Sequence, residues 1–329
     1  MSRERARRLV ANLFPWILFA LAVALVFSRL PNARSILSLW RPWGEIGILA
    51  LGMTAVLLTG GIDLSVGSIV TLSGMTLGLL NQRAGWPLVA SAIAAVVTGT
   101  LAGAINGLLV TMGIVPLLAT LATMALYAGL AMALSEGERI AGFPEEFGQF
   151  GQSTIAGIPS QLGLLCVACV VLGLLIHGTR FGRALFVIGD NRRGAEFAAV
   201  PVRKVEAGLY ALNGFLAGLV AVWFTARRGA AVPDAGLGLE LQTIACVVLG
   251  GTRVTGGSGS VGRTLLGLGV LANLEIGLRL WGNQSLGIPG TSMSFVLNAN
   301  ARLILVGVLL IFVATLNERL ALNTRESNR

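Results

Sequence analysis

The chain has 329 residues, of which 55% are hydrophobic and only 12% are charged, and its formal net charge is +9. Soluble domains usually carry about 25% charged residues, so this composition excludes an ordinary soluble domain, a disordered chain and a disulfide-rich scaffold. Residues 84–135 and 147–179 contain no Asp, Glu, Lys or Arg. Such runs are typical of membrane spans, and the basic excess then reports orientation rather than binding to nucleic acid.

The hydrophobic runs predict an all-α integral membrane protein with about ten transmembrane helices, forming a single membrane domain over residues 1–329. A helix needs about 20 residues to cross about 30 Å of hydrocarbon. We expect spans near residues 14–30, 45–61, 64–82, 87–111, 114–134, 160–177, 207–226, 237–252, 262–282 and 301–317. These spans use most of the chain, so no separate soluble domain is expected.

The basic residues predict the orientation, because cytoplasmic loops carry an excess of Lys and Arg. With the amino terminus inside, most of these residues fall on the cytoplasmic side, and both termini are cytoplasmic. The pair Arg227 and Arg228 is an exception, since it falls outside. The basic loop 178–206 then lies inside and the loop 135–159 lies outside.

The outer loop 135–159 is acidic and contains several Gly and Pro residues, which predicts a shaped surface segment rather than a helix. A plain solvated connection is the alternative for this loop and for the inner loop 178–206. The outer loop carries the glutamates Glu136, Glu138, Glu145 and Glu146.

Two glycine-rich breaks interrupt the apolar sequence, so that some helices are expected to be discontinuous. Gly60 and Gly61 separate two spans, and Gly250 and Gly251 lie near the end of a charge-free run, 241–252, that covers only about 18 Å as a helix. Irregular backbone at membrane depth is tolerated only where protein or a watery cavity surrounds it. Paired interrupted segments in a transporter point to the solute pathway.

Ionisable and polar residues inside the spans are the other candidates for a pathway or a gate. Asp63 either caps the helix that follows it or serves the pathway, and Glu275 either pairs with Arg279 or has a functional role. The polar amides either contact the solute or join neighbouring helices. The full set of pathway or gating candidates is Gly60, Gly61, Asp63, Ser65, Asn106, Asn213, Gln242, Gly250, Gly251, Asn273 and Glu275.

Two helices carry glycines four residues apart, which lets another helix approach closely. One set is Gly99, Gly103 and Gly107, and the other is Gly214 and Gly218. We expect packing within the chain, and an interface between subunits is the alternative.

No pattern indicates an enzyme. The segment 251–258 has the outline of a phosphate-binding loop, but Gly257 stands where the lysine should be, so this chain is not expected to hydrolyse ATP. Carboxylates and the single histidine show no metal-ligand spacing, and we expect no catalytic residue and no metal site. Cys166 and Cys169 are expected to be small buried hydrophobic residues, Cys246 lies alone in another apolar run, and no disulfide framework is indicated.

Three motifs in order resemble the permease subunits of bacterial ribose-type sugar ABC importers. The first is residues 60–68 (GGIDLSVGS). The second is residues 189–191 (GDN) followed by Ala195 and 200–205 (VPVRKV). The third is residues 247–252 (VVLGGT) followed by 256–262 (GGSGSVG). Gly194 and Pro201 depart from the family pattern in the second motif, where alanine and a polar residue are more common.

The resemblance implies a permease in the bacterial inner membrane that moves a monosaccharide or sugar-like solute by alternating access. Its implied partners are a second permease copy or a related permease, cytoplasmic ATP-binding subunits and a periplasmic solute-binding protein. This chain itself would need no cofactor, because ATP and Mg would be used by the ATPase. The alternatives are an ion-coupled secondary transporter and a channel or scaffold without pumping.

The resemblance also implies that the loop 178–206 is the cytoplasmic ATPase-coupling loop and that the loop 135–159 is periplasmic. A short coupling helix is expected within residues 191–200. The coupling candidates are Gly189, Asp190, Asn191, Arg192, Arg193, Ala195, Glu196, Phe197, Ala198, Ala199 and Val200.

Overall fold

The computed structural model describes residues 16–28, 32–282, 286–287, 294–295, 304 and 307–308. Both chain ends and nearly all of the expected span 301–317 lie outside the described residues. The chain forms two compact units. The larger unit contains Arg41–Ile244 and Thr252–Val261, and the smaller one contains Met1–Trp40, Ala245–Gly251 and Gly262–Arg329.

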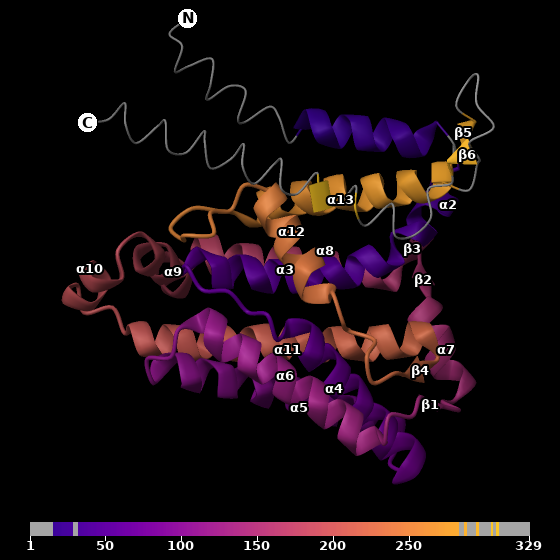
Figure 1. The fold of residues 1–329 in the computed structure, drawn as a ribbon, viewed down its shortest axis with the longest axis horizontal. Helices are drawn as coiled ribbons and strands as arrows, with labels where there is room; N and C mark the ends of the chain where they lie inside the picture. The colour runs from indigo at the N-terminus through magenta and orange to yellow at the C-terminus, as the bar shows by residue number, and fades with distance from the viewer. Residues whose placement is uncertain are drawn as a thin grey trace, which may run out of the picture. The chain divides into compact units, whose positions relative to one another are not determined.

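The larger unit is a helical bundle (Figure 1). Its helices are α3 (Arg41–Leu58), α4 (Val66–Gly78), a short π-helix (Leu79–Arg83), α5 (Leu88–Thr111), α6 (Pro116–Ser135), α7 (Glu145–Gln152), α8 (Ser160–Gly178), α9 (Arg180–Asp190), α10 (Arg192–Phe197) and α11 (Val202–Arg228). Two short antiparallel pairs join its loops, β1 (Ile140–Ala141) with β4 (Ala230–Ala231) and β2 (Thr154–Ile155) with β3 (Ile158–Pro159).

The smaller unit is also mainly helical in its described part. It contains the helix Trp16–Phe27, α2 (Ala33–Leu39) and nearly all of α13 (Val261–Gly282). It also contains the strands β5 (Leu286–Gly287) and β6 (Ser294–Phe295), which pair with each other. The helix α12 (Leu239–Leu249) begins in the larger unit and ends in the smaller one.

The helices divide into interior and lipid-facing ones, as expected for an all-α membrane protein. Every residue of α3 from Trp43 to Leu58 is buried. In the most apolar stretch of α11, 61% of residues are buried, whereas the corresponding share is 28% in α5, α6 and α8. Among the described residues, α5, α6, α8, α11 and α13 are long and apolar enough to cross a membrane.

The glycines of α5 and α11 form one seam between these two neighbouring helices (Figure 1). A Cβ atom on Gly99 would lie 2.6 Å from the Gly214 carbonyl oxygen and 2.7 Å from Gly218 Cα. A Cβ on Gly103 would overlap the Tyr210 carbonyl oxygen. The prediction of packing within the chain is therefore confirmed, because the glycines let the two backbones touch.

The loop 135–159 corrects one expectation, because it contains the eight-residue helix α7. Glu145 and Glu146 in its first turn complement the helix dipole. Phe147 is buried, and a Cβ on Gly151 would lie 2.8 Å from Ala226 Cβ of α11. The local Gly and Pro content therefore failed to reveal a helix that is stabilised by packing of one apolar face.

The break expected near Gly250 is confirmed by the length of α12. This helix has 11 residues, which is about 16 Å and about half of a membrane crossing. Gly251 follows it with a φ of +86°, a left-handed conformation that glycine adopts without strain.

We predict that Gly103→Ala and Gly129→Ala have opposite effects on stability. The added methyl group at Gly103 overlaps α11, and such overpacking costs typically about 1–3 kcal/mol. A methyl group added at Gly129 on α6 would meet no atom within 4 Å, so alanine there only improves helix propensity. Thermal unfolding of the purified variants measures the difference, and equal midpoints would contradict the seam.

Candidate functional site

Asp63 lies in the break between α3 and α4 and is fully buried. Its Oδ1 accepts hydrogen bonds from the Ser65 backbone N–H at 2.9 Å and from the Ser65 hydroxyl at 2.6 Å. Its Oδ2 accepts a hydrogen bond from Asn213 Nδ2 of α11 at 2.7 Å. The carboxylate therefore closes the turn that precedes α4, and it also ties this turn to α11.

Helices α5 and α6 complete a polar network around the same turn. Asn106 Nδ2 donates to the Ser65 hydroxyl at 2.7 Å, and the Tyr127 hydroxyl lies 3.3 Å from Asn106 Oδ1. The Thr120 hydroxyl accepts from the Leu64 N–H at 3.1 Å. We call Asp63, Ser65, Asn106, Asn213 and Tyr127 the Asp63 network.

The structure thus brings together four of the pathway candidates, Asp63, Ser65, Asn106 and Asn213. Sequence reasoning missed Thr120 and Tyr127. Their signal was a buried polar face on α6, where Thr120, Thr123 and Tyr127 share one side of the helix.

Two buried atoms beside this network have no hydrogen-bond partner within the described residues. They are Asn213 Oδ1 and the Tyr210 hydroxyl, both on α11. A Cβ on Gly61 would lie 2.7 Å from the Tyr210 hydroxyl, so the absence of a side chain at Gly61 makes room for this ring.

The remaining pathway candidates lie on or beside α12 and α13. Gln242 is half-buried on α12, and a Cβ on Gly250 would overlap the Arg263 carbonyl oxygen. Asn273 Nδ2 donates to the Gly269 carbonyl of its own helix at 2.8 Å. Glu275 is half-buried on α13. The Asn273 side chain therefore bonds to the backbone of its own helix. The absence of a side chain at Gly250 permits close packing of the end of α12 on α13.

The three sequence motifs meet at one backbone contact, which we call the glycine junction (Gly60, Gly189, Gly256 and Gly257). The Gly257 N–H donates to the Leu58 carbonyl at 2.9 Å. A Cβ on Gly189 would overlap that carbonyl and the Gly257 nitrogen, and a Cβ on Gly256 would lie 2.7 Å from the Gly60 nitrogen. The junction joins the end of α9 directly to the break that carries Asp63.

The short helix expected within residues 191–200 is present as α10. The Asn191 side chain caps it by accepting from the Gly194 N–H at 2.9 Å. At the other end, Ala199 adopts a φ of +57°, and the Val200 N–H donates to the Ala195 carbonyl at 3.0 Å. This is a Schellman ending in which alanine occupies the position that usually holds glycine.

Two ion pairs fix Arg192 at the start of α10. Its guanidinium binds both carboxylate oxygens of Glu206 on α11, and it lies 3.6 Å from Glu196. Phe197, in contrast, is 92% exposed. The helix is therefore anchored through one residue and presents an apolar side chain outward through another.

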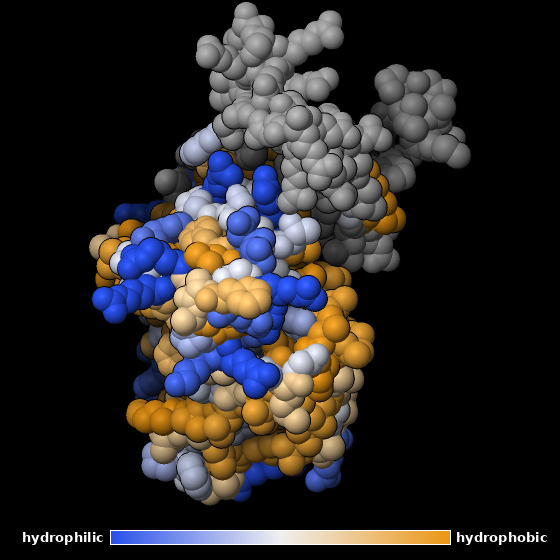
Figure 2. All heavy atoms as spheres, turned by 90° about the vertical axis from the view of Figure 1, so that its left-hand side faces the viewer, coloured by the Kyte–Doolittle hydropathy of each residue, from blue (hydrophilic) through white to orange (hydrophobic). Residues whose placement is uncertain are grey.

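Helices α9 and α10 lie at one end of the larger unit, and α7, β1 and β4 lie at the opposite end (Figure 1). Figure 2 looks onto the α9–α10 end and shows hydrophilic side chains gathered there, with hydrophobic residues on the flanks. This distribution is typical of a membrane protein seen from its aqueous face.

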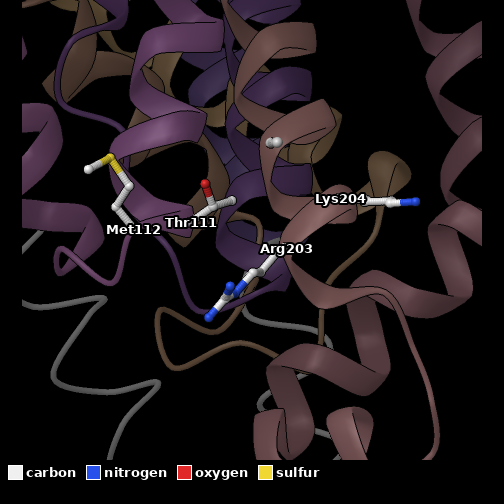
Figure 3. A pocket seen from close by; sticks show the side chains of 5 residues that line it. Thr111, Met112, Arg203 and Lys204 are labelled. Atoms are coloured by element: carbon white, nitrogen blue, oxygen red, sulfur yellow. The ribbon is translucent and has the colours of Figure 1, made fainter.

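A shallow depression of about 530 Å³ lies on the larger unit between the end of α5 and the start of α11. It is lined by Thr111, Met112, Arg203, Lys204 and Ala207 (Figure 3). In Figure 3 the Lys204 side chain points away from Thr111 and Met112, so the two cations do not converge on one point.

A buried ion pair that sequence reasoning missed ties α3 to α11 near the α7 end. Arg227 donates from Nε to Glu45 Oε1 at 2.8 Å and from Nη2 to Oε2 at 2.7 Å. The guanidinium of Arg228 lies 4.2 Å from the centre of the Phe224 ring. These contacts give both of the adjacent arginines at the end of α11 a partner within the larger unit.

Within the described residues, no group of three His, Cys, Asp or Glu side chains could hold a metal ion. Cys166, Cys169 and Cys246 are free, and the expectation that Cys166 and Cys169 are buried is wrong, because Cys166 is exposed and Cys169 is half-buried on α8, whereas Cys246 is buried.

Comparison with known proteins identifies the family. Residues 35–314 match the family model described as the branched-chain amino acid transport system / permease component. The chain is 37% identical to the autoinducer 2 import system permease protein LsrD of Salmonella typhi over 294 residues, which cover 87% of each chain. It is 39% identical to the ribose import permease protein RbsC of Bacillus subtilis over 255 residues, which cover 76% of this chain and 79% of RbsC. No solved structure matches the chain.

The family match covers most of the chain, and the apolar helices agree with it. The chain therefore belongs to this permease family of ABC importers, as a multi-pass membrane subunit of a transporter rather than an enzyme.

Proposed function

We propose that the chain imports a monosaccharide or sugar-like solute into the cytoplasm by alternating access, powered by a separate ATPase. The observation that carries this proposal is the glycine junction, because it connects an exposed, capped helix at one end of the larger unit to the buried Asp63 network. The names of two relatives, an autoinducer 2 importer and a ribose importer, support the class of solute.

In this proposal the whole chain is one permease domain with about ten spans and with both termini in the cytoplasm. The loop 178–206 is cytoplasmic and the loop 135–159 is periplasmic. The opposite positions of α9–α10 and α7 in the larger unit support these two assignments (Figure 1).

The α9–α10 segment couples the permease to the ATPase. Phe197 and the exposed residues of α10 occupy a groove of the ATPase, while the Arg192–Glu206 pair holds α10 on α11. When the ATPase pair closes, α9 moves, and Gly189 transmits this movement to Leu58 and Gly257. ATP and Mg bind to the ATPase, and this chain contributes no cofactor.

The Asp63 network acts as the gate in this proposal, with Gly60 and Gly61 as its hinge. Asn213 Oδ1 and the Tyr210 hydroxyl have no hydrogen-bond partner in the described part of this structure. They gain partners when α4 and α11 shift, and these new hydrogen bonds stabilise the second conformation of the gate. The other candidates, Gln242 on α12 and Asn273 and Glu275 on α13, line the solute pathway in this proposal. Asp63 already accepts three hydrogen bonds, which favours a structural carboxylate over the ion-binding one that a secondary transporter requires.

The remaining partners follow from the same proposal. A second permease copy, or a related permease, completes the membrane part. A periplasmic solute-binding protein docks on the outer loop, where Glu145 and Glu146 are exposed on α7. Glu136 and Glu138 instead lie near Arg83, at 3.8 Å and 2.9 Å.

Asp63→Asn is expected to destabilise the permease, because the amide nitrogen faces hydrogen-bond donors and the charge-assisted bonds are lost. Such bonds contribute about 1.5–3 kcal/mol each. The midpoint of thermal unfolding in detergent measures this effect, with Glu146→Gln as a control that removes an exposed charge. A midpoint equal to that of the control would show that the network does not hold the break.

Glu196→Pro is expected to abolish stimulation of the ATPase by the solute-loaded binding protein in reconstituted complexes. Proline inside a helix costs about 3 kcal/mol, so α10 loses its shape. Glu196→Ala keeps the helix and should retain stimulation. Solute-driven hydrolysis that is unchanged in the proline variant would refute the coupling role of α10. Uphill uptake by the purified chain with only an ion gradient would refute the proposed function itself.

Replacing Glu145 and Glu146 by glutamine is expected to weaken docking of the binding protein roughly tenfold at low salt, through a slower association rate. The matched change of Glu136 and Glu138 should have a smaller effect, because these glutamates already interact with Arg83. Surface plasmon resonance on the permease in nanodiscs measures both. An unchanged affinity of the binding protein for the Glu145 and Glu146 variant would contradict a role of this loop in docking.

A further inference from the structure

The segment 232–238, which connects β4 to α12, runs down the side of α4 rather than over the surface of the bundle. Next to its start, Ala231 packs against Gly78 near the end of α4, since a Cβ on Gly78 would lie 3.0 Å from the Ala231 Cβ. The Gly236 N–H then donates to the Thr71 hydroxyl at 2.9 Å. Beyond the segment, Glu240 lies against Gly67 in the first turn of α4.

The contacts on α4 thus move from Gly78 to Gly67 as the chain advances. Eleven residues of α-helix correspond to about 16 Å, which is about half the thickness of the hydrocarbon core. The segment 232–238 therefore re-enters the membrane from the end that carries β1 and β4, and α12 starts at membrane depth. We call it the re-entrant segment.

The re-entrant segment is irregular, and it is exposed at membrane depth. Its backbone makes a series of turns, with the Leu237 N–H donating to the Asp234 carbonyl at 3.1 Å and the Leu239 N–H donating to the Gly236 carbonyl at 3.1 Å. Leu237 is 83% exposed, and the Asp234 side chain is exposed as well. Irregular backbone does not face lipid, and it occurs at this depth only within protein or beside water.

The charge of Asp234 decides between these two surroundings. A carboxylate is costly both in lipid and between packed protein surfaces unless it is paired. Asp234 lies close enough to Arg228 at the end of α11 to act on it electrostatically, but no salt bridge within 4.0 Å joins them in the described structure. Asp234 thus lies at the mouth of the segment, beside the end of α11, where an unpaired, exposed carboxylate is stable in contact with water, and the exposed Leu237 follows Gly236 farther along α4.

We propose that the re-entrant segment lines a water-filled solute pathway, with the Asp234 carboxylate as an acceptor for hydroxyl groups of the passing solute and with Leu237 exposed to the same water. The identity of the solute rests on the proposed function, but the presence of water does not. Carboxylates suit hydroxylated ligands, because each oxygen accepts hydrogen bonds from O–H donors.

Cysteine accessibility tests this proposal. The background is a functional variant in which Cys166, Cys169 and Cys246 are alanine, reconstituted with the ATPase in proteoliposomes. Leu237→Cys and Asp234→Cys should each react with a membrane-impermeant methanethiosulfonate at least about tenfold faster than Leu130→Cys, which is exposed on the lipid-facing side of α6. The adduct at Leu237→Cys should also block solute uptake, and the adduct at Leu130→Cys should not.

Two results would overturn the proposal. One is a reaction at both Leu237→Cys and Asp234→Cys as slow as at Leu130→Cys. The other is slow labelling combined with efficient oxidative cross-linking of Leu237→Cys between two permease copies, since the segment would then be buried in a protein interface. Cysteine labelling needs neither the solute nor ATP. A failure of ATP-driven uptake would therefore count against the proposed function, and the labelling rates would still test whether the segment contacts water.

Discussion

Two helix backbones can touch as α5 and α11 do only where neither carries a side chain at the contact. The glycines of the seam meet this requirement at intervals of four residues, so that they stay on one face of each helix over several turns. Asn106 lies between two seam glycines of α5, and Asn213 precedes a seam glycine of α11. The close approach of the backbones therefore places Asn213 beside Asp63 and Asn106 beside Ser65, and the polar network depends on it.

A second set of glycines links this network to the end of the molecule that carries α9 and α10. At the glycine junction, backbone atoms of Gly189, Gly256 and Gly257 lie against the carbonyl of Leu58 and the break at Gly60. Contacts between backbone atoms leave little slack, because no flexible side chain lies between them. In the proposed mechanism, a displacement of α9 would therefore reach the turn around Asp63 over a short and stiff route.

The sequence allowed the features that depend on local periodicity and spacing to be predicted. The helices followed from apolar runs, and the packing of Gly103 on another helix followed from the glycine spacing. The short helix α10 was expected from the resemblance of its segment to a known family. The cap that Asp63 could form was one of two alternatives, but Asp63 instead closes the turn before α4, whose N-cap residue is Ser65 without a side-chain cap hydrogen bond. The helices depend mainly on residues that are near one another in the chain, whereas the glycine spacing predicted that Gly103 packs on a helix without identifying α11 as that helix.

The features that were missed depend on partners that are distant in the chain. Glu45 and Arg227 are separated by 182 residues, and no local pattern indicates their pairing. Tyr127 reaches the Asp63 network only through the packing of α6. The helix α7 is stabilised by its contact with α11, which composition does not reveal. The left-handed conformation of Ala199 is likewise imposed by the ending of α10, since alanine has no preference for it.

The most direct test of the central claim is a double-mutant cycle on the stability of the permease in detergent, with Gly103→Ala, Asn213→Ala and the double variant. If the seam positions Asn213 for Asp63, the alanine at Gly103 already weakens that hydrogen bond, and the second change then costs less. The account predicts an interaction free energy of about 0.5–3 kcal/mol between the two sites. Effects that add within about 0.5 kcal/mol would show that the network forms independently of the seam, and would contradict the account.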